Sequence, residues 1–305
     1  MGLRTKTRSR LGLCLVVSGE FHPRLAYAFG LPDAPERALM VTLPLRGGQS
    51  MEQRFTFDQV ASVYRSARPD YPEALIDDVI AYADLHSHDR LLEVGCGTGQ
   101  ATKGFARRGF QILATDPGPQ MLRAARECLA GFDHVEFLQS TFEAFPATSQ
   151  LFRLIIAAQS WHWVSPQVRF VNAAELLSSE GSLAVFGHVP VGLPIPLRDT
   201  FRQIYLRRIG QWGPPPEAWY LPDGPFKGWF DESGLFQPVL HRSYSWQWQH
   251  TTASYTDFLR TRSDHRMLAA QTRDHLLGEI AEAIDGAGGT LAVDYETHLY
   301  MARRR

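Results

Sequence analysis

The apolar positions of the chain follow an alternating pattern from residue 90 onward. Short apolar runs typical of buried strands occur at residues 90–94, 111–115, 135–138, 152–158 and 182–186. Amphipathic segments with helical spacing separate several of these runs, at residues 100–108, 117–129 and 166–177. Buried strands that alternate with helices predict βαβ units and a parallel sheet that is covered on both faces.

The alternation of strand-like and helical patterns does not continue on either side of this region. Residues 1–50 show no sustained period and contain several prolines, so we expect a weakly ordered N-terminal extension. Helical spacing then appears between Phe57 and Tyr64, and a second helix is expected over residues 73–83. After the fifth strand, residues 189–235 are rich in proline and aromatic residues, which predicts either an insertion that caps a pocket or a hydrophobic satellite cluster.

The last third of the chain returns to regular patterns. A strand is expected over residues 239–248, helices over 255–259 and 273–284, and a final strand over 290–301. Gly288 and Gly289 suit a tight hairpin-type turn, so we expect the final strand to run antiparallel.

Composition and charge exclude several classes of protein. The 305 residues carry a formal net charge of −1, which argues against a nucleic-acid partner, and Arg303–Arg305 is expected to be a solvated tail. The three cysteines have no metal-binding spacing, so we expect no metal site and reduced thiols in a cytoplasmic protein. No run of 18 apolar residues occurs, so no membrane insertion is expected.

The first 30 residues contain the elements of a secretory signal. Basic residues precede the apolar run Leu11–Val17, and Ala26-Tyr27-Ala28 resembles a cleavage site. The apolar run is short and charged residues follow it, so a non-secretory extension is the favoured interpretation.

A glycine-rich turn carries the first candidate chemistry. Glu93-Val94-Gly95-Cys96-Gly97-Thr98-Gly99 ends a predicted strand and opens a helix, where open α/β sheets bind ligands. Glycines let the backbone turn tightly and approach a ligand closely. The spacing G-x-G-x-G differs from the G-x-G-x-x-G of dinucleotide folds, and a purely structural turn is the alternative. Cys96 is not expected to be a nucleophile, because no histidine partner is evident.

Asp116 follows the second predicted strand. A carboxylate in this position can accept hydrogen bonds from both hydroxyls of a ribose. The alternative role is a helix N-cap, since Asp116 directly precedes Pro117, and the two roles are compatible.

The segment LLEVGCGTGQATKGFARRGFQILATDPGPQML resembles motifs I and II of class I S-adenosylmethionine-dependent methyltransferases. FDQVASVYRSARPDYP, AAQSWHWVSP and TRSDHRML resemble a subgroup of small-molecule methyltransferases related to trans-aconitate methyltransferase. The resemblance covers roughly residues 55–302. It implies a methyltransferase domain over residues 51–305 and a Rossmann-like, seven-stranded, mostly parallel sheet with helices on both faces, an antiparallel last strand and a cap insertion after strand five.

The resemblance also implies S-adenosyl-L-methionine as methyl donor and a set of residues that bind it. Its methionine and ribose parts would contact Glu93, Gly95, Gly97, Gly99, Asp116 and Gln159. Its adenine would contact Pro117, Met121, Thr141, Phe142 and Glu143. The chain departs from many relatives at Phe142-Glu143, where they have Asp-Leu, and at Phe152-Arg153, where they have Phe-Asp.

The methyl acceptor is expected to be a small molecule with a carboxylate or a hydroxyl. Residues expected to line its site are Tyr64, Arg68, Tyr71, Trp161, Trp163 and His265. Core packing is the alternative for the two tryptophans. A hydroxyl acceptor would need a general base, for which His162 is the candidate, unless His162 serves a local hydrogen bond. A carboxylate would need a cation instead, such as Arg68, Arg262 or Arg266.

Two other functions compete with this prediction. An NAD(P)-dependent oxidoreductase is disfavoured by the glycine spacing and by the lack of a recognisable catalytic Tyr-x-x-x-Lys. A non-catalytic module that binds S-adenosylmethionine would retain the same glycines and Asp116.

Overall fold

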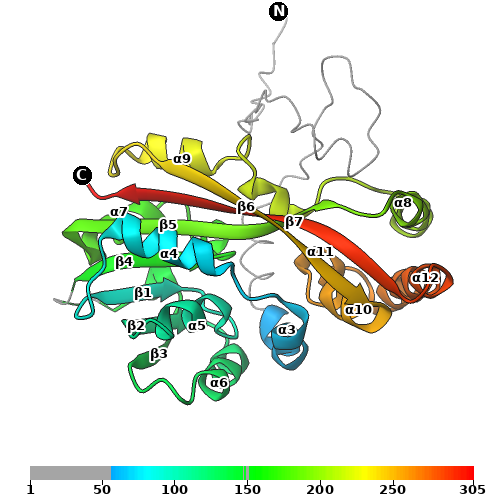
Figure 1. The fold of residues 1–305 in the computed structure, drawn as a ribbon, viewed down its shortest axis with the longest axis horizontal. Coiled ribbons are helices and arrows are strands. Elements are labelled where there is room, and N and C mark those ends of the chain that lie inside the picture. Colours follow the sequence, from blue (N-terminus) through cyan, green and yellow to red (C-terminus); the bar gives the residue numbers. More distant parts are fainter. Residues whose placement is uncertain (1–55, 147, 149–150) are drawn as a thin grey trace, which may run out of the picture.

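The computed structural model describes residues 56–146, 148 and 151–305, and the extension predicted for residues 1–50 lies outside this range (Figure 1). Seven strands form one sheet in the order β3-β2-β1-β4-β5-β7-β6. The strands are β1 (Arg90–Val94), β2 (Gln111–Asp116), β3 (Val135–Gln139), β4 (Phe152–Ala158), β5 (Leu177–Gly192), β6 (Leu240–Thr251) and β7 (Thr290–Arg303). The first five are parallel, and β7 runs antiparallel to both of its neighbours, β5 and β6. The predicted fold class is confirmed.

Helices cover both faces of the sheet because successive strand residues point to opposite sides. Leu91 and its equivalents pack with α4 (Glu73–Ala83), α5 (Gln100–Ala106) and α6 (Pro119–Cys128). Leu92 and its equivalents pack with α7 (Arg169–Leu176) and α9 (Phe226–Ser233). The central strands β1 and β4 are therefore buried on both faces, as their continuous apolar runs predict, whereas the edge strands β3 and β6 remain largely accessible to solvent.

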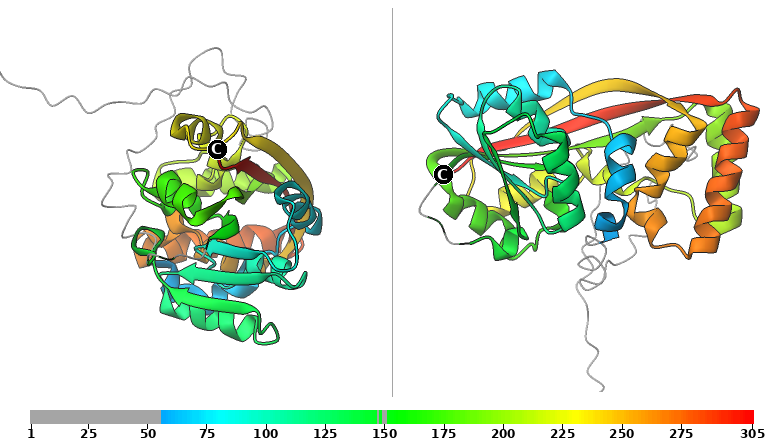
Figure 2. Two further views of the ribbon diagram at one scale, coloured as in Figure 1. Left: turned by 90° about the vertical axis from the view of Figure 1, so that its left-hand side faces the viewer. Right: turned by 90° about the horizontal axis from the view of Figure 1, so that it is seen from below.

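The strands β5, β6 and β7 extend well beyond the rest of the sheet (Figures 1 and 2). Their far ends carry a helical lobe, which we define as α8 (Ile195–Ile209), α10 (Thr252–Arg260), α11 (Ser263–Arg266) and α12 (Ala270–Gly286). Phe201, Phe258 and Ile280 belong to a buried apolar cluster of this lobe, which also includes residues of β7. The predicted fifth strand, residues 182–186, is thus only the centre of a longer one, which pairs with β7 from Ser182 to Gly192.

Residues 189–235, predicted to form a cap insertion or a hydrophobic cluster, contain the α-helices α8 and α9 and the 3₁₀ helix η4 (Pro216–Tyr220). Pro194 and Pro196 stand at the start of α8, where the missing N–H of proline costs nothing, and Gly210 ends the helix with a φ of 71°. Helix α9 instead buries Phe226 and Phe230 in the core of the sheet, as in the hydrophobic-cluster alternative.

The antiparallel last strand arises differently from the expected hairpin. Gly288 and Gly289, with φ of 106° and 75°, join α12 to β7 rather than one strand to another. Strands β6 and β7 pair from end to end, with Thr251 opposite Thr290, and helices α10–α12 connect them.

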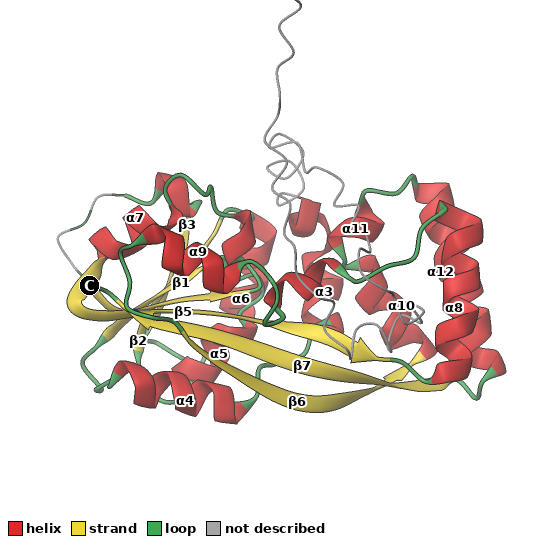
Figure 3. Ribbon diagram, turned by 90° about the horizontal axis from the view of Figure 1, so that it is seen from above, coloured by secondary structure: helices red, strands yellow, loops and turns green. Residues whose placement is uncertain are grey.

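A short N-terminal unit lies between the sheet and the helical lobe. The 3₁₀ helix η1 (Thr56–Val60) and helix α3 (Ala61–Ala67) contact α6 on one side, and α3 contacts α10 on the other (Figure 3). The chain then crosses through Arg68–Pro72 to reach α4. This crossing brings the segment predicted to bind the acceptor to the carboxyl ends of the central strands.

Among the described residues, no helix is both long and apolar enough to cross a membrane.

Candidate functional site

The glycine-rich turn joins the end of β1 to the start of α5. Gly95, Gly97 and Gly99 have φ of 69°, 55° and 89°, a left-handed region that side chains disfavour. A Cβ atom on Gly95 would also lie 2.6 Å from Cβ of Ser160, which follows β4. Gly95, where β1 ends, therefore has to be a glycine for two reasons: its backbone conformation and the lack of space for a side chain.

Asp116 lies at the end of β2 and faces this turn. Its Oδ2 accepts a hydrogen bond from Gly97 N at 3.0 Å, and its Oδ1 accepts one from Gly118 N at 2.8 Å. Burial raises the pKa of Asp116 to about 6, the two backbone hydrogen bonds oppose this shift, and Asp58 adds to it. Asp116 is not the N-cap of α6, because the cap residue is Gly118.

Asp58 on η1 caps α6 instead. Its Oδ1 accepts hydrogen bonds from Gln120 N at 2.6 Å and from Met121 N at 3.1 Å. The N-terminal unit is therefore tied to the turn that follows β2.

Glu93, in the strand before the turn, is completely buried. Thr102 donates a hydrogen bond to its Oε2 at 2.6 Å, while Oε1 has no hydrogen-bond partner among the described residues. Burial raises the pKa of Glu93 to about 8, opposed by Thr102 and reinforced by Asp116. The unpaired oxygen suits a cationic partner, which would lower this pKa.

Gln159, directly after β4, adopts a φ of 54°, which is uncommon for a residue with a side chain and typical of functional sites. Its N–H donates to Phe186 O at 2.8 Å, and its Oε1 accepts a hydrogen bond from the Tyr71 hydroxyl at 3.2 Å. Ser160 donates a hydrogen bond to Val94 O, so the ends of β1 and β4 are joined directly.

These groups surround an open pocket, whose space is about 710 Å³ when the solvent at its mouth is included. Residues predicted to bind the cofactor or acceptor that line it are Tyr64, Gly95, Gly97, Asp116, Met121, Phe142, Glu143, Gln159 and Trp163. Residues that line it but were not predicted are Phe57, Asp58, Val94, Gly118, Ala158, Ser160 and Val164. The sequence offered a sign for all of them, because each lies in one of the quoted segments. Phe57 and Asp58 lie in FDQVASVYRSARPDYP, Val94 and Gly118 in the segment from Leu91 to Leu122, and Ala158, Ser160 and Val164 in AAQSWHWVSP.

Residues 91–181 match the family model of a methyltransferase domain. An uncharacterised methyltransferase from Mycobacterium tuberculosis is 31% identical over 134 residues, which are 44% of this chain and 52% of the relative. The match thus spans about half of the relative's own length. A protein from Dictyostelium discoideum that carries a provisional methyltransferase name is 26% identical over 260 residues, or 81% of this chain and 94% of its own.

Solved structures share this fold. One from Anaeromyxobacter dehalogenans, provisionally named a type II methyltransferase, has a TM-score of 0.59 at 21% identity and covers 77% of this chain and 97% of its own. The [4+2]-cyclase SpnF has a TM-score of 0.50 at 18% identity, over 83% of this chain and 96% of its own.

Several residues that were predicted to bind the cofactor are not among those that line the pocket. Gly99 caps α5, and a Cβ there would meet Leu129 at 2.9 Å. Thr141 caps the 3₁₀ helix η2 (Phe142–Ala144) by accepting a hydrogen bond from Ala144 N. Pro117 O accepts a hydrogen bond from Gln139. These residues shape the loops that hold the lining residues.

The two tryptophans after β4 have different positions. Trp161 is 0% exposed and packs against Phe142 and Phe170 in the core, as in the packing alternative, whereas Trp163 lines the pocket. His162 between them has its Nδ1 3.3 Å from the Tyr220 hydroxyl. Burial, with a further contribution from Arg169, lowers the pKa of His162 to about 3. This neutral ring is a poor general base, and its contact with Tyr220 agrees with the local hydrogen-bond alternative.

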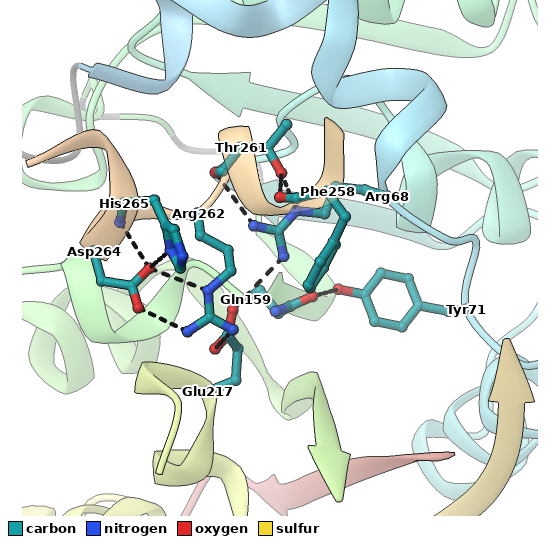
Figure 4. A network of polar contacts seen from close by, with 9 residues as sticks. All are labelled: Arg68, Tyr71, Gln159, Glu217, Phe258, Thr261, Arg262, Asp264 and His265. Carbon is teal, nitrogen blue, oxygen red and sulfur yellow. Dashed lines mark hydrogen bonds and ion pairs between the residues drawn. The ribbon is translucent and has the colours of Figure 1, made fainter. Parts of the chain in front are cut away.

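A polar cluster lies between the sheet and the helical lobe (Figure 4). Arg68 donates hydrogen bonds to Oγ1 and O of Thr261 at 3.0 and 3.3 Å, and its guanidinium lies over the ring of Phe258. Glu217 lies between two cations, with Arg68 Nη1 at 3.8 Å and Arg262 Nη1 at 3.4 Å. The two arginine side chains are only 10% and 9% exposed.

The remaining predicted acceptor residue, His265, belongs to the same cluster. Asp264 forms two hydrogen bonds with Arg262, at 3.1 and 2.8 Å, and its Oδ1 lies 2.9 Å from His265 Nδ1. His265 Nε2 lies 2.7 Å from the Tyr205 hydroxyl of α8. Because both ring nitrogens of His265 have hydrogen-bond partners, this residue links Asp264 to Tyr205, and it is not among the residues that line the pocket.

Within the described part of the chain, no group of three or more His, Cys, Asp or Glu side chains could hold a metal ion. Burial raises the pKa of Cys96 well above the ordinary value for a thiol, with Asp116 and Glu93 contributing, which agrees with rejecting it as a nucleophile.

Proposed function

We propose that this protein transfers the methyl group of S-adenosyl-L-methionine to a small-molecule acceptor with a carboxylate or a hydroxyl, by in-line displacement. The observation that carries the proposal is the convergence of Gly95, Gly97, Asp116 and Gln159 on one pocket in a domain whose family model is a methyltransferase. We also place the chain in the subgroup related to trans-aconitate methyltransferase, on the motifs quoted above.

The pocket fits each part of this cofactor. Glu93 is not among the residues that line the pocket, but it precedes the glycine turn, and its unpaired, buried Oε1 suits the positive charge of the methionine part. Gly95 and Gly97 line the pocket and carry no side chain that would block this part of the cofactor. Asp116 would accept hydrogen bonds from the ribose hydroxyls. Met121 and Phe142, both nearly buried and both lining the pocket, would pack against the adenine.

When bound, S-adenosylmethionine supplies a methyl group that its positively charged sulfur already activates. The protein then has to position the acceptor and keep water out. Phe57, Tyr64 and Trp163 form edge-to-face contacts along one side of the pocket, where they can exclude water. Their rings also attract a cation through their quadrupoles.

A carboxylate acceptor fits the surroundings better than a hydroxyl. Arg68 and Arg262, whose side chains are 10% and 9% exposed, flank Glu217 in the same polar cluster as Tyr71 and Gln159 (Figure 4). A carboxylate is nucleophilic without a base, and such cations can bind it. His162 and Tyr71 are poorly suited to deprotonate a hydroxyl, since burial lowers the pKa of His162 to about 3 and raises that of Tyr71 well above its ordinary value.

We further propose a cytoplasmic protein that has no nucleic-acid partner and does not insert into a membrane. The support is a net charge of −1 and the free thiols of Cys96 and Cys128.

The test is calorimetric titration of the full chain with S-adenosylmethionine, S-adenosylhomocysteine and NAD(H) in parallel. Micromolar binding of the first two without binding of NAD(H) supports the proposal. Binding of NAD(H) alone would replace it with a hydride-transfer function. Methyl release onto a panel of carboxylic acids, measured as S-adenosylhomocysteine formed, separates an enzyme from a module that only binds the cofactor.

A further inference from the structure

His188 on β5 is a buried histidine, and one of its two ring nitrogens has no hydrogen-bond partner among the described residues. It is 4% exposed, and its Nδ1 lies 2.7 Å from Oγ1 of Thr297 on β7. Its Nε2 is buried and has no hydrogen-bond partner among the described residues. Buried polar atoms nearly always have a partner, so an unpaired one calls for an explanation.

The neighbours of His188 bear on which nitrogen carries its proton. Trp246 Nε1, which can only donate, gives a hydrogen bond to Thr297 Oγ1 at 2.8 Å. The Thr297 hydroxyl can in turn donate its own proton to His188 Nδ1, which lies 2.7 Å away. In this arrangement the imidazole proton is on Nε2, which can then donate a hydrogen bond. In the other arrangement His188 Nδ1–H donates to Thr297, and Nε2 is an acceptor.

His188 lies next to the proposed site of methyl transfer. The ring of Tyr71 stacks on it with centroids 4.3 Å apart, and the Tyr71 hydroxyl binds Gln159 of the cofactor pocket. Burial lowers the pKa of His188 to about 3, and the positive charge of Arg68 contributes, so the ring stays neutral at physiological pH. A neutral ring with a fixed Nε2–H donates a hydrogen bond and does not act as a base.

A second unpaired group lies on the same face of the sheet. Thr297 is opposite His188, and Tyr295 is two residues away on β7, so all three point to one side. Tyr295 is 2% exposed, and its hydroxyl is also buried without a hydrogen-bond partner among the described residues. Two polar atoms on one face, His188 Nε2 and the Tyr295 hydroxyl, thus lack partners among the described residues, and the positive charge of Arg68 acts on both side chains.

We propose that His188 Nε2–H donates a hydrogen bond to an oxygen of the methyl acceptor, with its tautomer held by Thr297 and Trp246, and that the acceptor presents a carbonyl or carboxylate oxygen there. This inference rests on the proposed methyltransferase function. It makes His188 a binding residue and Thr297 a positioning residue, and it adds a neutral donor to the cationic groups of Arg68 and Arg262.

The first test needs no acceptor. The full chain, labelled with ¹⁵N-histidine and loaded with S-adenosylhomocysteine, reports the tautomer of each histidine in long-range ¹H–¹⁵N correlation spectra. The His188 signals are identified by their loss in His188→Gln. We expect the Nε2–H tautomer, unchanged between pH 5 and 8. A proton on Nδ1, or a protonated ring, would overturn the inference.

The second test uses benzoate as the probe, because an aromatic carboxylate suits a site that combines Tyr71, Trp246 and Arg68. Benzoate is expected to shift the His188 Nε2 signal, and toluene, which has the ring without the oxygens, is not. His188→Phe should weaken benzoate binding about tenfold, the loss of one hydrogen bond, while His188→Gln keeps a donor and retains part of it. Equal binding by all three proteins, or no shift with benzoate, would contradict the inference.

Thr297 supplies the matched control. Thr297→Ser keeps the hydroxyl and should keep the tautomer, whereas Thr297→Val removes the acceptor of the Trp246 proton and should give a mixture of tautomers. The melting temperatures of both variants check that each of them is folded. Failure of the two proposals can be distinguished: no binding of S-adenosylhomocysteine rejects the methyltransferase function, whereas normal binding with an Nδ1–H tautomer rejects only the role of His188.

Discussion

Asp58 and Asp116 hold the turn before α6 from two sides. A Cβ atom built on Gly118, between them, would lie 2.7 Å from Asp58 Oδ1 and 3.1 Å from Asp116 Oδ1. Asp116 binds the amide of Gly118, while Asp58 binds the next two free amides of the helix. Two carboxylates at such close range repel each other, which is one reason why the pKa of Asp116 is raised. The N-terminal unit therefore affects the cofactor pocket electrostatically as well as sterically.

Asp116→Ala is expected to weaken binding of S-adenosylmethionine by about 1–3 kcal/mol, because hydrogen bonds to a charged group are lost. Calorimetric titration measures the change. In the wild type, affinity should also fall below about pH 6, where Asp116 becomes protonated, and the variant should lack this dependence. Unchanged affinity in Asp116→Ala would refute the ribose assignment.

Asp58→Ala is expected to lower the free energy of unfolding by about 1 kcal/mol, the usual cost of losing a helix cap. Urea denaturation measures it. Asp58→Asn keeps an acceptor oxygen for the amides of Gln120 and Met121, so it should restore most of the stability. If the two variants are equally stable, the capping role is wrong.

Glu93→Gln is expected to stabilise the protein without ligand at high pH. The folded-state pKa of Glu93, about 8, lies above its ordinary value of 4.5, so folding favours the protonated form. The wild type should therefore lose stability as the pH rises from about 4.5 to 8, while the variant does not. The advantage of the variant, of the order of a few kcal/mol, should be complete above pH 8 and absent below pH 4.5. Denaturation curves at pH 4, 6, 7 and 9 measure it, and a constant difference would contradict the prediction.

Glu217→Gln is expected to strengthen binding of a carboxylate near Arg68 and Arg262, because it removes the negative charge that the two cations share. Titration of the protein loaded with S-adenosylhomocysteine with benzoate measures the change, and benzyl alcohol is the uncharged control. We expect a severalfold gain for benzoate alone. Equal changes for both probes would favour a hydroxyl acceptor.

Much of the fold and of the cofactor pocket could be predicted from local patterns. The strand, the glycine turn and the helix that follows occupy residues 90–106 without interruption, so spacing alone places Gly95 and Gly97 at the end of a strand. Asp116 follows from the same argument one unit later. Helix α8 was missed because its prolines suggest a break, whereas they stand in the first turn, where helices accept them.

The sequence by itself determined the alternation of strands and helices, the glycine turn and the acid at the end of β2, because each depends on neighbours in the chain. Only the tertiary structure decided that Asp58 caps α6, that Glu217 lies between Arg68 and Arg262, and that Thr297 contacts His188. The partners in these pairs are 45 or more residues apart, and no periodicity of the sequence indicates them. Asp58 reaches α6 because η1 and α3 pack against that helix. The other pairs form because β5, β6 and β7 are long strands that bring the last third of the chain back beside the first.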